Sequence, residues 1–300
     1  MSDTTASLRR TISGAEDLQS VVRSMRSLAA ASIGQYERSV RALDDYNRTV
    51  ELGLSACFRE IEQLGSATSE PPAGDTIGAV VFGSDQGLVG QFNDVVVDYA
   101  IEELAALPGD PVVWAVGERV QARLTDAGIS VVGVFPVPNT VSAIASLVGQ
   151  LQLDSEMHRT QGDYTRMYVF HNRPLSGALY QPVHQRLLPL DAVWQQNLAD
   201  VRWPTQNLPE VLGGVPGALR GLIREYLFIS LFRACAESLA SENASRLAAM
   251  QRADKSIDDR LQRLRATFRR LRQQQIDEEL FDVVAGYDAL TSKARSVPTR

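Results

Sequence analysis

The 300-residue sequence contains few of the side chains from which catalytic and metal sites are usually built. It has two cysteines and three histidines, and neither cysteine belongs to a Cys-x-x-Cys pair. His158, His171 and His184 are too widely spaced to act as the paired ligands of a zinc site. The Gly-x-Ser-x-Gly element of hydrolases is missing as well. The sequence therefore predicts no catalytic residue, no bound metal and no cofactor.

Long apolar runs and a strong positive charge are also missing. The stretch nearest in character to a membrane span, residues 219–239, contains five charged side chains, so no transmembrane helix is expected. The first seven residues show neither a secretory signal nor a transit peptide. A formal net charge of −6 argues against a general nucleic-acid binder. We expect a protein of a reducing, cytoplasmic compartment.

Proline is absent from the first 70 residues and from residues 217–290. In both stretches the core-type positions recur at steps of three and four, which is typical of a coiled-coil seam. The N-terminal seam positions are Leu18, Val22, Met25, Ala29, Ser32, Tyr36, Val40, Leu43, Tyr46, Val50, Leu54, Cys57, Ile61 and Leu64. The C-terminal ones are Ala240, Asn243, Leu247, Met250, Asp254, Ile257, Leu261, Leu264, Phe268, Leu271 and Gln275. Because a lone amphipathic helix leaves its seam in water, we expect the two ends to pair as a long antiparallel two-helix coiled coil.

Between these helices the pattern changes to short apolar runs that indicate buried strands. Strands are predicted at 77–82, 112–116, 131–137 and 166–171, with helices at 91–107, 119–127 and 141–153. An edge strand is expected at 187–190, reached through a hairpin or bulge at 180–185. Alternation of strands and helices predicts a mainly parallel, Rossmann-like sheet with helices on both faces. The fold class is therefore α/β, with helical domains at 1–65 and 215–291 and an inserted Rossmann-like α/β domain at 75–208.

A glycine-rich loop, 83–90, follows the first predicted strand, where doubly wound folds bind phosphate. A phosphate-binding P-loop needs lysine and then serine or threonine after its last glycine, and this chain has Gln91 and Phe92 there. The spacing of a dinucleotide fingerprint fails at Asp85 and Leu88. We favour a tight structural turn, with a nucleotide-dependent enzyme as an alternative.

Arginines dominate one part of the C-terminal helix. Between Arg260 and Arg272 there is no acidic residue, and four acidic residues then follow between Asp277 and Asp282. Charge beside a seam is ordinary for an exposed coil, but an excess of one sign predicts a partner of the opposite sign. An apolar tip follows, too exposed for a free helix unless a partner surrounds it. The tip consists of Leu280, Phe281, Val283, Val284 and Leu290.

Three motifs resemble those of one known family. The segment 84–93, Ser-Asp-Gln-Gly-Leu-Val-Gly-Gln-Phe-Asn, is similar to the Ser-Asp-x-Gly-Leu-x-Gly-x-x-Asn signature of the gamma subunit of F-type ATP synthases. Residues 242–250 and 272–280 resemble that family's last helix, and Ile12-Ser13 with the approach to Met25 resembles its first. The three motifs occur in the family's order over nearly the whole chain.

The resemblance implies a non-catalytic central-stalk rotor that couples ion flow to ATP synthesis or hydrolysis. Its implied partners are the alpha and beta subunits of the catalytic ring, the epsilon subunit and the membrane c-ring, at the cytoplasmic face of the cell membrane. By resemblance, Arg272 and Gln273 hydrogen-bond to acidic loops of a catalytic subunit, and Arg269, Asp277 and Met25 belong to the same contact region. The implied structural loop contains Ser84, Asp85, Gly87 and Gly90. A coiled-coil scaffold or adaptor with an α/β domain is the alternative from another class.

Two departures and one register follow from the same comparison. Asp277 stands where the family usually has threonine, and an acid there would repel an acidic loop. The first helix is also poorer in basic residues near Met25 than the family's, so the chain is a divergent member, interpreted as belonging to an alternate, sodium-translocating branch. If Met25 lies beside about Arg265, the antiparallel pairing would bring Cys57 close to Cys235, and mild oxidation would crosslink them.

Overall fold

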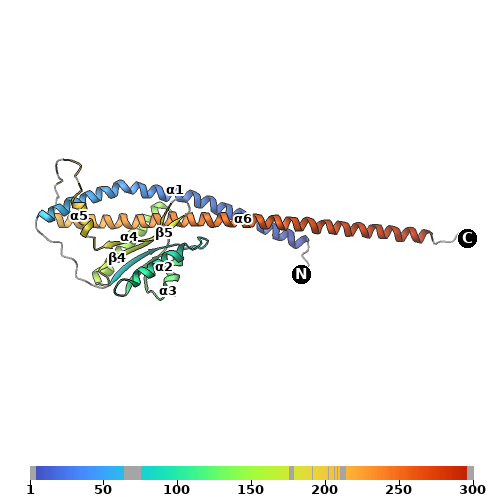
Figure 1. The fold of residues 1–300 in the computed structure, drawn as a ribbon, viewed down its shortest axis with the longest axis horizontal. Coiled ribbons are helices and arrows are strands. Elements are labelled where there is room, and N and C mark those ends of the chain that lie inside the picture. The colour runs from blue at the N-terminus through green and yellow to red at the C-terminus, as the bar shows by residue number, and fades with distance from the viewer. Residues whose placement is uncertain are drawn as a thin grey trace. The chain divides into compact units, whose positions relative to one another are not determined.

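The computed structural model describes residues 5–63, 76–175, 179–190, 192–201, 203–205, 207, 209 and 214–295. The elements in chain order are α1 (Thr5–Gln63), β1 (Ile77–Phe82), α2 (Phe92–Ala105), β2 (Pro111–Val116), α3 (Glu118–Asp126), β3 (Val131–Phe135), α4 (Val141–Gln161), β4 (Arg166–Pro174), β5 (Tyr180–Leu188), α5 (Ala192–Ala199) and α6 (Val215–Arg295) (Figure 1). They form two compact units. We call residues 27–249 the sheet unit, and residues 1–26 together with 250–300 the coil unit.

The sheet unit is built on five strands in the order β3-β2-β1-β4-β5. β1 pairs in parallel with β2 and β4, β2 pairs in parallel with β3, and β5 closes one edge in antiparallel orientation to β4. Every residue of β1 is buried, as expected for a central parallel strand that is covered on both faces. The predicted mainly parallel α/β sheet is confirmed.

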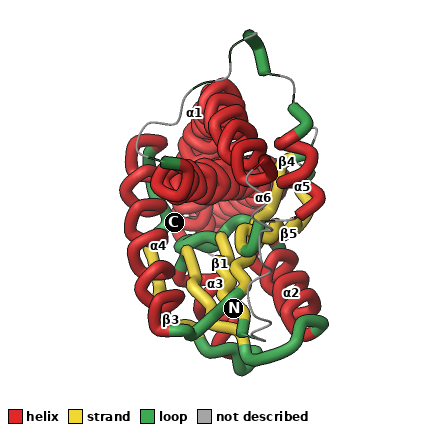
Figure 2. The backbone as a smooth tube through the Cα atoms, turned by 90° about the vertical axis from the view of Figure 1, so that its left-hand side faces the viewer, coloured by secondary structure: helices red, strands yellow, loops and turns green. Residues whose placement is uncertain are grey.

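The two faces of the sheet have different covers. Alternate β1 residues such as Ala79 and Val81 pack against α2 and α3. Val80 and Phe82 point to the other face and pack with residues of α4, α1 and α6 (Figure 2). The middle of α1 and the first part of α6 are therefore not separate from the sheet, because they cover one of its faces and share its core.

Several boundaries differ from the sequence-based expectations. β5 is one nine-residue strand, whereas only its last residues were expected to be a strand. Its sequence alternates polar and apolar residues because one face is partly open, so it lacks a continuous apolar run. α4 continues past 153 to Gln161 and ends at Gly162, whose φ of 86° allows the left-handed cap. The short helix α5 was not predicted, since eight residues give too little periodicity.

α1 and α6 run antiparallel within the sheet unit. Asp44 of α1 accepts an ion-pair contact of 2.8 Å from Arg233 of α6. Further along α1, Gly53 faces Leu222, and a Cβ on this glycine would lie 3.0 Å from the leucine Cδ2. The absent side chain lets the two helices approach closely there. Val50, Leu54 and Phe58, next to it on α1, form an apolar cluster with residues of α5 and α6.

The expected proximity of the two cysteines is wrong. Both thiols are free and buried. Cys235 belongs to the apolar cluster that contains Tyr36 of α1, and its charge contributes to the raised pKa of that tyrosine after burial and Glu242. Cys57 lies roughly 30 Å further along the same helix, at 1.5 Å per residue. The two sulfur atoms therefore cannot form a disulfide in this fold.

The sharpest steric constraint in the sheet unit lies directly after β1. The Gly83 N–H donates to the Val116 carbonyl at 2.8 Å, and a Cβ on Gly83 would lie 1.9 Å from Cγ2 of Val120. We expect Gly83→Ala to lower the free energy of unfolding by about 2–3 kcal/mol, because a buried neighbour must move. Gly149→Ala in α4 is the matched control, since its Cβ would meet no atom within 4 Å. It should be neutral or stabilising by up to about 1 kcal/mol. Urea unfolding of the two variants compares them, and equal stabilities would contradict the packing.

Candidate functional site

The coil unit is an antiparallel pair of helical segments with an apolar seam. On α6 the seam runs through Met250, Ile257 and Leu261 to Leu271, as predicted from the sequence. On α1 the buried positions are Leu8, Gln19 and Val22, with Ile12 and Ala15 half-buried. Leu18 was expected in the seam, but 53% of it is exposed, and Gln19 takes that place.

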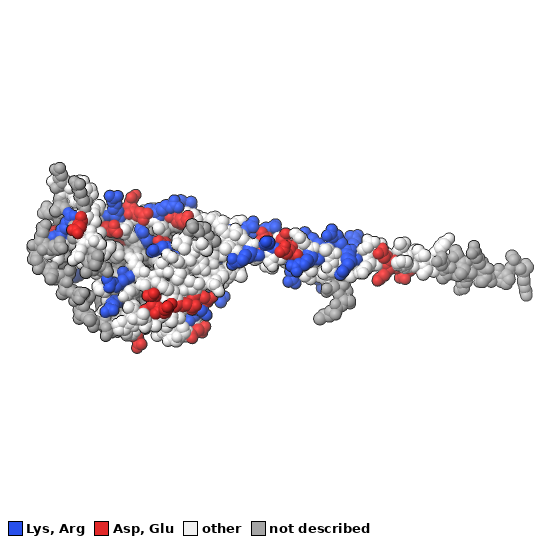
Figure 3. All heavy atoms as spheres, viewed as in Figure 1, with Lys and Arg blue, Asp and Glu red and all other residues white. Residues whose placement is uncertain are grey.

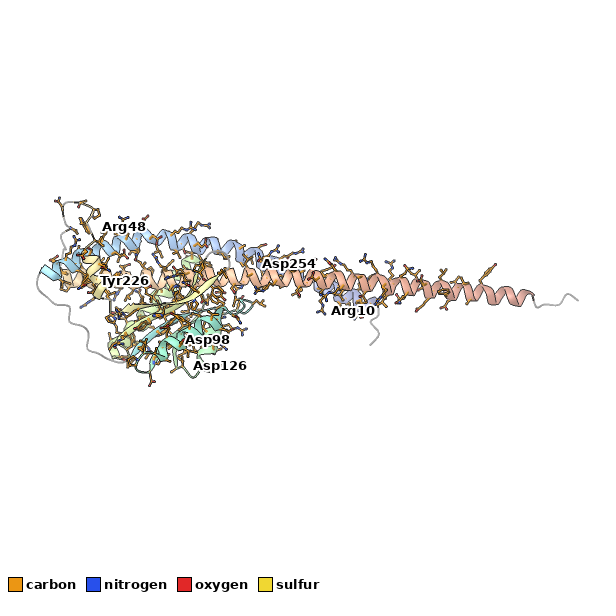
Figure 4. The ribbon with its side chains drawn as sticks, viewed as in Figure 1. Arg10, Arg48, Asp98, Asp126, Tyr226 and Asp254 are labelled. Atoms are coloured by element: carbon orange, nitrogen blue, oxygen red, sulfur yellow. The ribbon has the colours of Figure 1, made fainter. Side chains whose placement is uncertain are left out.

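A single carboxylate explains why a polar side chain occupies the seam. Asp254 of α6 accepts hydrogen bonds from Gln19 at 3.2 Å, from Arg23 at 3.2 Å and from Arg26 at 2.9 Å (Figure 4). Its side chain is only 14% exposed. A partly buried charge with three donors penalises every other alignment of the helices, because a shift would leave it unpaired. Asp254 is thus the polar residue that specifies the register of the coil.

The same register appears nearer the start of α1. Arg265 of α6 forms an ion pair of 2.5 Å with Glu16, and the Arg9 guanidinium lies 5.8 Å from the centre of the Phe268 ring. Met25 therefore lies at the level of Asp254. The register that placed Met25 beside Arg265 is wrong by roughly ten residues.

Four of the five expected contact residues lie together on α6. Arg269, Arg272, Gln273 and Asp277 are all exposed. Within the described residues, neither Arg269 nor Arg272 has a carboxylate at ion-pair distance. Gln273 Nε2 donates to Asp277 Oδ1 at 3.0 Å, so the unusual acid at this position holds the neighbouring amide. Met25 is half-buried on α1 and is separated from Arg269 by roughly 20 Å of helix.

From Arg272 to Tyr287, every side chain of α6 is exposed. The large apolar side chains follow helical spacing and form one stripe, with exposures of 48% to 69%: Ile276, Leu280, Val283, Val284 and Tyr287. Acidic residues occupy the positions between them. Figure 3 shows the arginine-rich part of α6 followed by this acidic group. The described segment has the surface of a helix that is made to be surrounded.

The glycine-rich loop uses its polar groups within the chain. The Ser84 backbone N–H donates to Asn93 Oδ1 at 2.9 Å, and Asn93 Nδ2 donates to Ser84 Oγ at 2.8 Å. Asp85 accepts from the backbone N–H of Glu118 at 3.0 Å and from that of Val137 at 2.9 Å. The first-turn donor of α3 is thereby paired with the loop's own carboxylate, at the type of position where a phosphate binds in other folds.

The turn itself depends on left-handed backbone conformations. Gly90 has φ 60°, and Leu88 adopts φ 64°, which is uncommon for a residue with a side chain. Gly87 has ordinary φ, and a Cβ there would meet only the Arg119 guanidinium at 3.6 Å. Of the predicted loop glycines, Gly90 is therefore the one whose backbone conformation favours glycine.

Comparison with known proteins identifies the family. The profile of a family described as ATP synthase matches residues 4–290. The chain belongs to the ATP synthase family. An ATP synthase gamma chain of Clavibacter sepedonicus is 29% identical over 294 residues, covering 94% of this chain and 96% of the relative. One of Moorella thermoacetica is 25% identical over 289 residues, with coverage of 94% and 98%. The resemblance to gamma subunits is thus confirmed.

Solved structures show the same fold. A chain from the Euglena gracilis mitochondrial ATP synthase has a TM-score of 0.65 at 16% identity and covers 99% of this chain, with 97% of its own length. A chain from the Tetrahymena thermophila mitochondrial ATP synthase, solved as central stalk and c-ring, has a TM-score of 0.56 at 20% identity, with coverage of 78% and 99%. Among the described residues of our family member, no helix has an apolar stretch long enough to cross a bilayer.

The structure brings together two of the ATP synthase family motifs that lie far apart in sequence. Ser245 Oγ of α6 donates to the Val89 carbonyl in the glycine-rich loop. One turn earlier, Glu242 forms a 2.6 Å ion pair with Arg246, and both side chains are largely buried. Burial raises the pKa of Glu242 against the attraction of Arg246, with Asp85 of the loop adding to the rise. The loop is therefore a contact between sheet and helix.

Sequence reasoning missed a second polar link in this ATP synthase chain. His171 of β4 is 2% exposed, and its Nε2 lies 2.7 Å from Glu237 of α6, which Arg173 also contacts at 3.0 Å. Burial favours a higher pKa for Glu237, but the hydrogen bonds and charges of His171 and Arg173 hold it below its usual range. No spacing in the sequence marks this pair, because its members are distant and belong to different elements.

The register role of Asp254 is testable by hydrogen exchange. Asp254→Ala removes the acceptor of three side chains, two of them on arginines that are 40% and 56% exposed. After allowance for solvent screening, we expect a loss of about 1–2 kcal/mol in the opening free energy of the coil unit, or about tenfold faster amide exchange. The control Asp259→Ala, an exposed acid on the same helix, should change exchange by less than about twofold. Equal effects of the two changes would refute the role of Asp254.

Proposed function

We propose that this chain is the gamma-type central-stalk rotor of a rotary ATP synthase. The single observation that carries the proposal, beyond family membership, is the exposed part of α6 from Arg272 to Tyr287. A helix with a stripe of exposed apolar side chains and unpaired arginines next to it is unfavourable in water. A ring of subunits that encloses this helix would remove the apolar stripe from water and pair the arginines.

The coil unit has the asymmetry that a rotor needs. Its two helices differ in sequence, and one of them continues beyond the last seam residue, Leu271. Such a pair presents a different surface in each direction, so each subunit of a surrounding symmetric ring meets a different face. Differential contact is sufficient to shift a binding site between tight and loose states. Rotation of the pair would then pass these states around the ring.

The contact residues are Arg269, Arg272 and Gln273. Guanidinium groups pair well with carboxylates, and the resemblance assigns acidic loops of a catalytic subunit as the partner. Asp277 accepts the hydrogen bond of Gln273 and orients its amide, so the acid acts through its neighbour instead of facing the partner loop. Met25 stays a prediction of a contact at another level of the coil.

The proposal extends to the chain's assembly. The chain itself is non-catalytic, since the glycine-rich loop uses its polar groups internally. Its partners are the alpha and beta subunits of the catalytic ring, with the epsilon subunit and the membrane c-ring at the sheet unit. The chain would be a peripheral subunit at the cytoplasmic face of the membrane. A scaffold or adaptor accounts for the coil but not for a family match over residues 4–290.

The contact residues are tested by ATP synthesis in membrane vesicles that contain the assembled complex. We expect Arg269→Ala with Arg272→Ala to lower gradient-driven synthesis about tenfold, because each lost contact at an interface costs about 1–2 kcal/mol. The matched control is Arg38→Ala with Arg48→Ala, two exposed arginines of α1 in the sheet unit. This control should retain synthesis within about twofold.

Both doubly substituted chains should assemble and keep their helical circular dichroism, because all four side chains are exposed. Unchanged synthesis in the Arg269 and Arg272 variant would refute the assignment of these contacts. An equal loss in the control would show that charge, and not position, matters.

A further inference from the structure

The sheet unit contains a cavity that the proposed rotor function does not use. It has a volume of about 360 Å³ and lies between α4 and α6, against β4 and β5. Its apolar walls are formed by Met167, Leu188, Leu219, Ile223, Leu227 and Leu231. A second cavity of about 250 Å³ shares Leu188, Leu219 and Ile223 with the first. This size and lining are typical of sites for small ligands.

The rim of the cavity carries an unbalanced positive charge. Glu156 of α4 forms an ion pair with Arg224 of α6 at 3.2 Å, and Gln152 donates to the Arg224 carbonyl at 2.9 Å. One turn further toward the start of α6, Arg159 and Arg220 line the same cavity. Among the residues that the structure describes, neither of these two guanidinium groups has a carboxylate at ion-pair distance.

Two like charges at one rim disfavour each other, and an anion between them would relieve that repulsion. Arginine is suited to this role, since its planar group donates two parallel hydrogen bonds to a phosphate or carboxylate. Arg159 also lines the second cavity, so it stands where the two apolar spaces meet. The site therefore combines a cationic rim with an apolar interior.

We propose that this cavity binds a single-chain amphiphile with an anionic phosphate or carboxylate head. The head pairs with Arg159 and Arg220, and the apolar chain lies along Leu219, Ile223 and Leu227. The cation pair selects the head against neutral alcohols, and the apolar walls select a chain-bearing ligand against a free anion. This assignment is independent of the rotor role, since it involves none of the coil-unit residues.

The probe is dodecyl phosphate, titrated calorimetrically into the full-length chain below the critical micelle concentration. We expect one site per chain, and an affinity that rises about fourfold for each methylene added between octyl and dodecyl phosphate. Dodecanol and inorganic phosphate should each bind at least tenfold more weakly. Inorganic phosphate that binds as tightly as dodecyl phosphate would overturn the proposal in favour of a simple anion site, and equal binding of dodecanol would overturn the role of the arginines.

Two variants locate the ligand. Arg159→Gln with Arg220→Gln should lower the affinity for dodecyl phosphate at least tenfold, while Arg38→Gln with Arg48→Gln should leave it unchanged. Ile223→Trp should abolish binding by filling the space. If Ile223→Trp does not fold, the arginine variant still decides, because both arginines are exposed. Full affinity in the Arg159 and Arg220 variant, or no binding to the unaltered chain, would overturn the proposal.

Discussion

An 81-residue helix with an apolar stripe cannot stand alone in water, and the arrangement of this chain follows from how α6 is covered. In the sheet unit its first part shares a core with the sheet, α4 and α1. In the coil unit α1 alone covers the seam as far as Leu271. Beyond that residue the described side chains are exposed up to Tyr287. The cover thus decreases in steps along one helix, and the exposed end is where a partner is required.

Polar groups decide how these apolar surfaces align. A seam of leucine, valine and methionine tolerates sliding by a turn, because apolar contacts have little directionality. Asp254 with its three donors removes that freedom in the coil unit. In the sheet unit, Ser245 on the loop carbonyl and Glu237 on His171 fix α6 to the sheet. A shaft that transmits torque needs such fixed positions, since a sliding helix would lose the angular relation between its two ends.

The sequence predicted what depends on periodicity and on local motifs. The seam of α6, the parallel strands and the glycine-rich turn each leave a pattern within a few residues of one another. The edge strand β5 and the helix α5 escaped because one is half-exposed and the other is short. The register was wrong because a one-turn or longer shift leaves the same apolar pattern, and the residue that fixes it, Asp254, is a single acid among many. The buried Gln19 replaced Leu18 for the same reason, since its place depends on a contact with the distant helix. The pairing of His171 with Glu237 and the Arg159–Arg220 rim depend on tertiary packing and have no local signature.

The central claim is that the exposed end of α6 is enclosed by other subunits. The most direct measurement is affinity purification of the tagged chain from its own cells, followed by mass spectrometry of the intact complex and hydroxyl-radical footprinting of residues 272–287. The account predicts two kinds of ATPase subunit, each in several copies per copy of this chain, and protection of the Ile276 and Leu280 side chains in the complex compared with the isolated chain. Recovery of the chain without such subunits, or equal labelling of this segment in both states, would contradict it.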